Sequence, residues 1–113
     1  MEKQLEIKSM ISGNWTEYRR LMPEVGALHE PLTEEVYKDG VISGKNKRLM
    51  ALVGGLVHGC RGCILSQTEY ALQLGATPDE LLEACAVAVS LGGTMAAAES
   101  ARVVGYLTEK ELL

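Results

Sequence analysis

The sequence predicts a single all-helical domain, and three observations support this prediction. The 113 residues are 47% hydrophobic but only 4% aromatic, without a phenylalanine, so Leu, Val, Ala and Met must build the core. Such side chains suit close helix packing better than a β-sandwich, which favours aromatic and β-branched residues. Apolar residues recur with a helical period, most clearly over residues 45–58, and no segment shows the alternation of a half-buried strand. The length fits one domain, assigned to residues 1–113.

The N-terminal third carries the weaker helix signals. A short helix is expected over residues 15–22, ending ahead of a proline, whereas the segment 9–14 has no clear assignment. Residues 23–39 are expected to form one or two helical pieces. Thr33 is a candidate N-cap because two glutamates follow it, where the helix dipole favours acidic groups. Gly40 is expected to end this region.

The remaining two-thirds predict four helices with recognisable ends. The first covers residues 45–58, and the second covers 61–74 and ends at a glycine. The third begins with the Thr-Pro-Asp-Glu sequence at 77–80, which is typical of a capping box, and ends at Gly92–Gly93. The fourth covers 95–107. Its alanine- and glycine-rich face suits tight packing within the chain or between subunits.

Charge and hydropathy exclude several classes of protein. The net charge is −4 and no basic stripe is present, so a nucleic-acid partner is not expected. The first residues lack the apolar run of a signal peptide. The longest uncharged stretch, residues 84–98, is too short and too interrupted to span a bilayer, so no membrane association is expected. We therefore expect a cytoplasmic protein, in which stable structural disulfides are rare.

The strongest chemical signal is the pair Cys60 and Cys63. In a helix, such residues lie one turn apart on the same face, about 5–6 Å between Cα atoms, which a disulfide can bridge. Gly59 and Gly62 leave the sulfurs approachable. If Cys60 begins the following helix, free N–H groups and the helix dipole stabilise its thiolate, and Arg61 adds positive charge. The spacing therefore favours thiol–disulfide chemistry.

Two other interpretations of this pair stay open. Structural zinc needs four ligands, so His58 and Cys85 would have to complete the set. Alternatively, the cysteines are inert and buried, since a free cysteine packs well as a small apolar residue. Cys85 itself lies in an apolar segment and is expected in the core. No metal and no cofactor is expected beyond a redox-active disulfide.

Four other polar residues are candidates for the site. Gln67 follows Cys63 by one helical turn, so its amide either hydrogen-bonds a thiol, a peroxide or a water, or fills a helix contact. His58 either moves protons or bonds a carbonyl at a helix end. Arg48 lies near a helix N-terminus that disfavours cations, which indicates an anion contact, a subunit salt bridge or a solvated end. Glu69 is expected to be solvated or ion-paired, with proton relay as the lesser alternative.

Several segments together resemble the carboxymuconolactone decarboxylase-like, or AhpD-like, family. These segments are GVISGKNKRLMAL at 40–52, CRGCI at 60–64, LGATPDELLE at 74–83 and the glycine pair at 92–93. The resemblance is strongest over 40–104. It implies an orthogonal bundle of about six helices that assembles as homo-oligomers, trimers or hexamers. AhpD-type members are alkyl hydroperoxidases or thiol–disulfide adaptors, whereas true lactone decarboxylases of the family generally lack the cysteine pair.

The resemblance also implies roles for individual residues. It makes Cys63 the peroxidatic cysteine and Cys60 the resolving one, whereas the helix-start argument favours Cys60 as the more activated thiol. The family's redox members often carry a glutamate at the position of Arg48 and a histidine at the position of Gln67. Both ends of the usual proton relay are thus replaced, and a neutral amide cannot act as a general base. Efficient peroxide reduction then requires a substitute base, for which His58 and Glu69 are the candidates.

These observations predict a thiol–disulfide oxidoreductase or an alkylhydroperoxidase-type antioxidant protein. Its expected partners are a small peroxide or disulfide substrate, a thiol reductant or redox partner protein, and further copies of the chain. One alternative is a non-catalytic, redox-sensing oligomer that has lost the family relay. Another is a decarboxylase-like enzyme acting on a small carboxylate, with Arg48 binding the anion.

Overall fold

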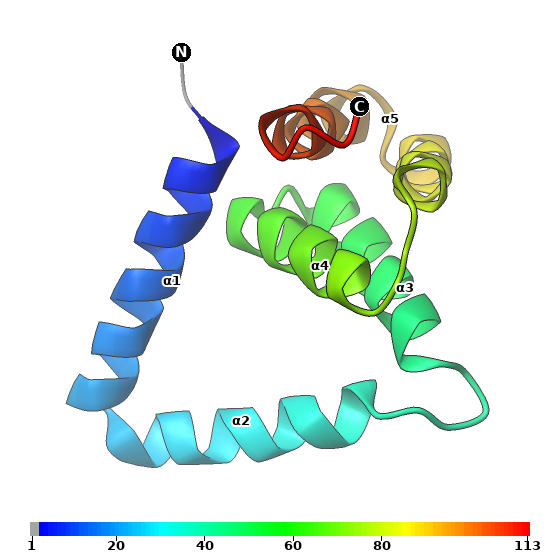
Figure 1. The fold of residues 1–113 in the computed structure, drawn as a ribbon. Coiled ribbons are helices and arrows are strands. Elements are labelled where there is room, and N and C mark those ends of the chain that lie inside the picture. Colours follow the sequence, from blue (N-terminus) through cyan, green and yellow to red (C-terminus); the bar gives the residue numbers. More distant parts are fainter. Residues whose placement is uncertain (1–2) are drawn as a thin grey trace.

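The computed structural model describes residues 3–113, and within this range the chain contains five helices and no strand. The helices are α1 (Gln4–Leu21), α2 (Pro23–Tyr37), α3 (Gly44–His58), α4 (Arg61–Gln73) and α5 (Pro78–Glu109). Helices α3, α4 and α5 pack together, while α1 and α2 run as an arm along the outside (Figure 1). The all-helical prediction is confirmed.

The core lies between α3, α4 and α5. Its largest completely buried aliphatic side chains come from all three helices: Leu52, Leu56, Ile64, Leu81 and Leu107. A second, smaller cluster attaches α1 to the core. In it, Ile7 of α1 packs with Leu65 of α4 and Tyr106 of α5. Burial of these side chains is the main stabilising contribution, since each completely buried aliphatic residue gives about 1.5–3 kcal/mol.

Helix α5 is broken in the middle, as the glycine pair predicts. Gly93 has φ 65° and ψ −144°, which is not a helical conformation, so α5 consists of two helical segments. With this break, residues 3–113 form six helical segments. The start of α5 is also as predicted, because Thr77 and Glu80 form the reciprocal hydrogen bonds of a capping box.

By length and hydropathy alone, α5 is the one described helix that could cross a membrane. The sequence instead predicts a stretch too short and too interrupted for this, and the helix is indeed interrupted at Gly93. Only 28% of the most apolar window of α5 is buried within this chain. The core helix of a soluble protein passes the same test, so the expected absence of a membrane stays a prediction.

The structure corrects three expectations about the N-terminal third. Residues 9–14 belong to α1, which begins at Gln4 instead of residue 15. Residues 23–37 form one helix that continues through Pro31, so Thr33 is not an N-cap; its hydroxyl donates to the carbonyl of His29 at 3.0 Å. This helix ends at Tyr37, three residues before Gly40. The first two corrections have different causes: the start of α1 is capped by Glu109 from the far end of the chain, whereas the hydroxyl of Thr33 bonds a carbonyl of its own helix.

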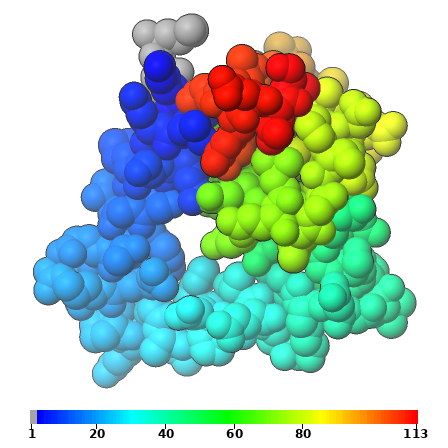
Figure 2. All heavy atoms as spheres, in the orientation of Figure 1, coloured from blue at the N-terminus to red at the C-terminus, as the bar shows by residue number. Residues whose placement is uncertain are grey.

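The arm formed by α1 and α2 leaves much apolar surface uncovered. Figure 2 shows a hollow between α1, α2 and the core helices. Along α2 a row of apolar side chains is 42–76% exposed: Val25, Leu28, Leu32 and Val36. This row is named the α2 apolar face below.

Candidate functional site

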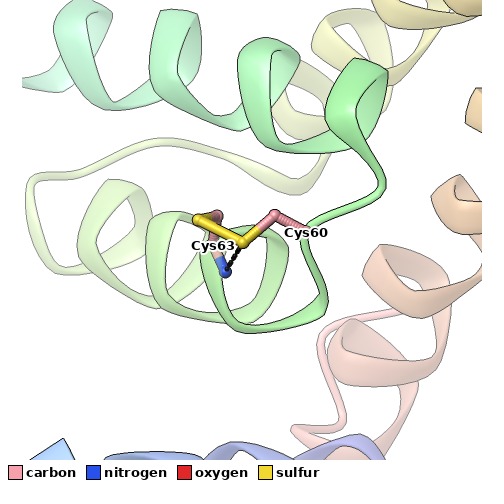
Figure 3. Close-up of a disulfide and its surroundings, with 2 residues drawn as sticks. All are labelled: Cys60 and Cys63. Carbon is pink, nitrogen blue, oxygen red and sulfur yellow. Dashed lines mark hydrogen bonds between the residues drawn. A yellow bond between two sulfur atoms is a disulfide. The ribbon is translucent and has the colours of Figure 1, made fainter.

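Cys60 and Cys63 form a disulfide where α3 ends and α4 begins (Figure 3). Gly59 closes α3 in the left-handed conformation, with φ 69°, which glycine adopts without strain. Cys60 then becomes the N-cap of α4, and the two Cα atoms are 5.2 Å apart. The predicted spacing and the predicted helix start are therefore both found. Cys60 is half-buried and Cys63 is exposed, which contradicts the interpretation of inert, buried cysteines.

A hydrogen bond distinguishes the two sulfurs. The backbone N–H of Cys63 donates to the Sγ of Cys60 at 3.2 Å (Figure 3). Cys60 thus caps α4 with its sulfur, in the way that a serine or aspartate caps other helices. Negative charge on the Cys60 sulfur is therefore stabilised by this N–H and by the dipole of α4.

Three helices approach the segment 59–63, which carries the pair. A Cβ at Gly55 of α3 would lie 3.1 Å from the Cβ of Cys63, so only a glycine permits this approach without a shift. A Cβ at Gly62 would lie 3.3 Å from Ile11 of α1, and one at Gly59 would lie 3.2 Å from the sulfur of Met95. The disulfide is thus supported by packing on several sides and reaches solvent through Cys63.

Arg48 and Gln67, at the two positions where the family resemblance implies an acid and a histidine, contact each other. The Nη1 of Arg48 donates to the Oε1 of Gln67 at 3.1 Å. Because a guanidinium has no acceptor, Gln67 must turn its oxygen toward Arg48, and its NH2 group is the end left for other partners. Gln67 lies one turn beyond Cys63, about 6 Å along the axis of α4. The two positions thus form a chain of hydrogen-bond donors instead of a proton relay.

Two tyrosines enclose Arg48. Its guanidinium carbon lies 3.6 Å from the ring centroid of Tyr37 and 4.2 Å from that of Tyr70. The Nε of Arg48 is buried without a hydrogen-bond partner, and burial lowers the pKa of this side chain. Sequence reasoning missed both tyrosines. Tyr70 could have been predicted, since it follows Cys63 by seven residues on the same face of α4. Tyr37 could not, because the chain between α2 and α3 brings it to Arg48 only in the folded protein.

The two candidate substitute bases lie apart from this group. His58 is exposed in the last turn of α3, and its ring makes no hydrogen bond with any residue that the structure describes. The alternative of a carbonyl bond is therefore not found. Glu69 forms an ion pair with Lys8 of α1, which agrees with its expected ion-paired state. Within residues 3–113, neither His58 nor Glu69 forms a hydrogen bond with Gln67.

No metal-binding group is found among residues 3–113: nowhere do three His, Cys, Asp or Glu side chains gather in a metal-binding arrangement. Cys85, which a zinc site would require, is buried in the core as a free thiol, as expected from its apolar surroundings.

Together, the helical bundle and the cysteine pair at a helix junction match a known family. The model of the carboxymuconolactone decarboxylase family matches residues 23–105, so this chain belongs to that family. The resemblance seen in the sequence is thereby confirmed.

Solved structures of the family share the fold. A crystal structure of a carboxymuconolactone decarboxylase family protein from Legionella pneumophila, in its apo form, superposes with a TM-score of 0.87 at 29% identity. The superposition covers 94% of this chain and 95% of that one. A protein from Thermotoga maritima gives a TM-score of 0.73 at 30% identity, over 87% of this chain and 93% of that one.

Among curated proteins, an uncharacterized protein of Cupriavidus necator is 30% identical over 69 residues. The match covers 61% of this chain and 61% of that protein.

Proposed function

We propose that this protein is a thiol–disulfide oxidoreductase whose reactive group is the Cys60–Cys63 pair. The observation that carries the proposal is the position of this disulfide: it caps a helix N-terminus and has one exposed sulfur. An antioxidant role is supported by a second crystal structure from Thermotoga maritima. It is that of a carboxymuconolactone decarboxylase family protein for which a part in the antioxidative response has been suggested. It superposes with a TM-score of 0.70 at 32% identity, over 76% of this chain and 89% of that one.

We propose a different task for each cysteine, because Cys63 is exposed and Cys60 is half-buried. In the reduced protein, the exposed Cys63 thiolate attacks one sulfur of a substrate disulfide, and the substrate's other sulfur leaves as a thiolate. Cys60 then attacks the Cys63 sulfur of the mixed disulfide and releases the second substrate thiol. The sum is one protein dithiol oxidised and one substrate disulfide reduced to two thiols.

The return step uses the helix cap. A reductant thiolate attacks Cys63, and Cys60 leaves as a thiolate that the N–H of Cys63 stabilises. A second reductant thiol then frees Cys63. We place this cycle in the cytoplasm, where small thiols supply the electrons.

A hydroperoxide is the second candidate substrate. Cys63 thiolate would take the terminal oxygen and release an alcohol, and Cys60 would displace water from the sulfenic acid to form the disulfide. Gln67 can donate a hydrogen bond to the departing oxygen but cannot remove the thiol proton. We therefore propose that peroxide reduction is slow relative to disulfide exchange.

The proposal is tested by assaying disulfide and peroxide reduction in the native protein, Cys60→Ser and Cys63→Ser. We expect Cys63→Ser to abolish turnover and Cys60→Ser to accumulate a mixed disulfide on Cys63, detected by mass spectrometry. Equal activity in all three proteins would exclude the proposed function. Activity that persists on a small carboxylate without either thiol would instead favour decarboxylase-type chemistry.

The redox-sensing alternative rests on the replaced relay at Arg48 and Gln67. The double variant Arg48→Glu with Gln67→His restores the family's residue types. A large gain in peroxidase rate, without a change in the redox potential of the pair, would indicate that the native chain has lost catalytic machinery that its fold still accommodates.

We also propose that the chain assembles with copies of itself. It exposes 7000 Å², whereas a compact monomer of this size exposes about 6,100 Å². The excess is comparable to the roughly 800 Å² that each partner contributes to a standard interface. The α2 apolar face is our candidate for this contact, because its four neighbouring apolar side chains are 42–76% exposed.

Sedimentation of the native protein and of Leu28→Lys tests this assembly. We expect the native chain to sediment as a trimer or hexamer and the variant to shift toward monomer. Glu34→Lys, an exposed change on the same helix, is the matched control and should leave the assembly intact. A native chain that remains monomeric as its concentration is raised to about 100 µM would contradict the proposal.

A further inference from the structure

We propose that Arg48 binds an anionic group of the substrate, so that the protein prefers disulfides that carry a carboxylate close to the sulfur. The inference rests on the proposed function, since it concerns the substrate of the Cys60–Cys63 pair. It assigns to Arg48 a task in recognition instead of proton transfer.

The first argument is that Arg48 has no counter-ion. Helix α3 contains no acidic residue, and the single acid of α4, Glu69, is paired with Lys8. No residue among 3–113 offers a carboxylate to Arg48, whose hydrogen-bond partner in this range is the neutral amide of Gln67. Charged groups that are partly removed from water normally have an opposite charge beside them. An unpaired, half-buried guanidinium therefore indicates an anion supplied from outside the described chain.

The second argument is that Arg48 is held in one orientation. The rings of Tyr37 and Tyr70 lie on the guanidinium at 3.6 and 4.2 Å, and Gln67 fixes one of its ends. A planar fork held in this way is pre-organised for a carboxylate, because little side-chain entropy is lost when the anion binds. Nε is enclosed and Nη1 donates to Gln67, so Nη2, which makes no hydrogen bond among residues 3–113, is the donor left for an anion.

The third argument is the distance to the reactive sulfur. Gln67 lies about 6 Å from Cys63 along α4, and Arg48 is in contact with Gln67. Cys63, Gln67 and Tyr70 occupy positions i, i+4 and i+7, which share one helix face. In our proposal, a substrate that places its sulfur at Cys63 extends along this helix face, and a carboxylate three bonds further on points toward the Gln67–Arg48 pair. The free NH2 of Gln67 lies between these two points as an additional donor.

The experiment compares two disulfides that share the S–CH2–CH2 unit beside the sulfur and differ in charge. Reduced protein is mixed with 3,3′-dithiodipropionate, which is a dianion, or with bis(2-hydroxyethyl) disulfide, which is neutral. Oxidation of the cysteine pair is followed by acid quench, alkylation and mass spectrometry. Each rate is divided by the rate of the same disulfide with dithiothreitol, which removes the intrinsic reactivity of the reagents. The quantity of interest is the anion preference, defined as the ratio of the two normalised rates.

We expect the anion preference to fall about 3- to 10-fold in Arg48→Gln, as for the loss of a charge-assisted hydrogen bond at a half-exposed site. Arg20→Gln removes one positive charge from an exposed part of α1 and is the matched control, which should keep the native ratio. Arg48→Lys keeps the charge but not the fork, so an intermediate ratio is expected. It also serves if Arg48→Gln does not fold. In the native protein, 0.5 M NaCl should lower the ratio, because salt screens such contacts.

The outcomes separate the two proposals. If both disulfides oxidise the native pair and the ratio is the same in the native protein, Arg48→Gln and high salt, the anion site is wrong while the oxidoreductase function stands. If neither disulfide oxidises the pair at all, the oxidoreductase function itself fails.

Discussion

At the scale of single residues, Cys85 has surroundings opposite to those of the reactive pair. It is buried in the core, and burial raises the pKa of its thiol while a hydrogen bond with Ser100 acts in the other direction. Little thiolate is therefore present at pH 8. We expect iodoacetamide to label reduced native protein first at Cys63, and Cys85 only after urea is added. Peptide mass spectrometry measures this order, and rapid labelling of Cys85 in the native state would contradict it.

Glu80 makes the stability of the protein depend on pH. The hydrogen bond from Lys45, with the backbone bond to Thr77, holds the pKa of this carboxyl below its ordinary value of 4.5. Because the folded pKa is the lower one, Glu80 contributes stability above pH 4.5 that is lost as the pH falls through the folded value. We expect Glu80→Gln to reduce the loss of stability between pH 7 and pH 3.

Urea unfolding of the native protein and the variant at both pH values measures this difference. Glu83→Gln, one turn further along α5 and exposed, is the control and should keep the native pH dependence. A Glu80→Gln protein with the same pH dependence as the native chain would show that the bond to Lys45 contributes nothing.

At the scale of helices, two glycines are expected to respond in opposite ways to the same substitution. Gly93 has φ 65° and ψ −144°, a conformation that side chains rarely adopt, so Gly93→Ala should lower the free energy of unfolding by about 1–3 kcal/mol. Gly13 lies inside α1, and a Cβ there meets nothing within 4 Å. Gly13→Ala should therefore raise the free energy of unfolding by about 0.5–1 kcal/mol. Urea titrations of both variants measure the two signs, and equal signs would contradict the break in α5.

The ends of helices could be predicted wherever the capping group is close in sequence. The capping box of Thr77 with Glu80 and the end of α3 before Gly59 both depend on local signals, and the structure confirms both predictions. The start of α1 was missed because its first N–H groups are capped by Glu109, from the other end of the chain. The N-cap prediction for Thr33 was wrong because a threonine hydroxyl can either cap a helix or bond the carbonyl four residues earlier. The neighbouring sequence does not distinguish the two arrangements.

The site could be predicted to a similar extent. Cys60 and Cys63 are a pair that spacing alone brings together, and the family resemblance pointed separately to Arg48 and Gln67. That these last two bond each other depends on how α3 packs on α4, which no single segment encodes. The roles of these residues stay predictions.

At the scale of the whole molecule, Glu109 joins the two ends of the chain. Its carboxylate accepts from the N–H of Gln4 at 2.7 Å and from that of Leu5 at 3.1 Å. Removing a helix cap costs about 0.5–2 kcal/mol, so Glu109→Ala should destabilise the protein by that amount and speed hydrogen exchange at the start of α1. Exchange measured by mass spectrometry tests this, with the exposed Glu111→Ala as control. Unchanged exchange in α1 would show that the cap is dispensable.

The last residue of α2 links the arm to Arg48. Tyr37 ends that helix and also supplies one of the two rings that enclose Arg48. A displacement of the arm would therefore move Tyr37, one of the two rings, away from Arg48. A neighbouring subunit bound to the arm would keep both rings in place. Association between chains and selectivity for charged substrates would then rise and fall together, although the cysteines themselves lie on other helices.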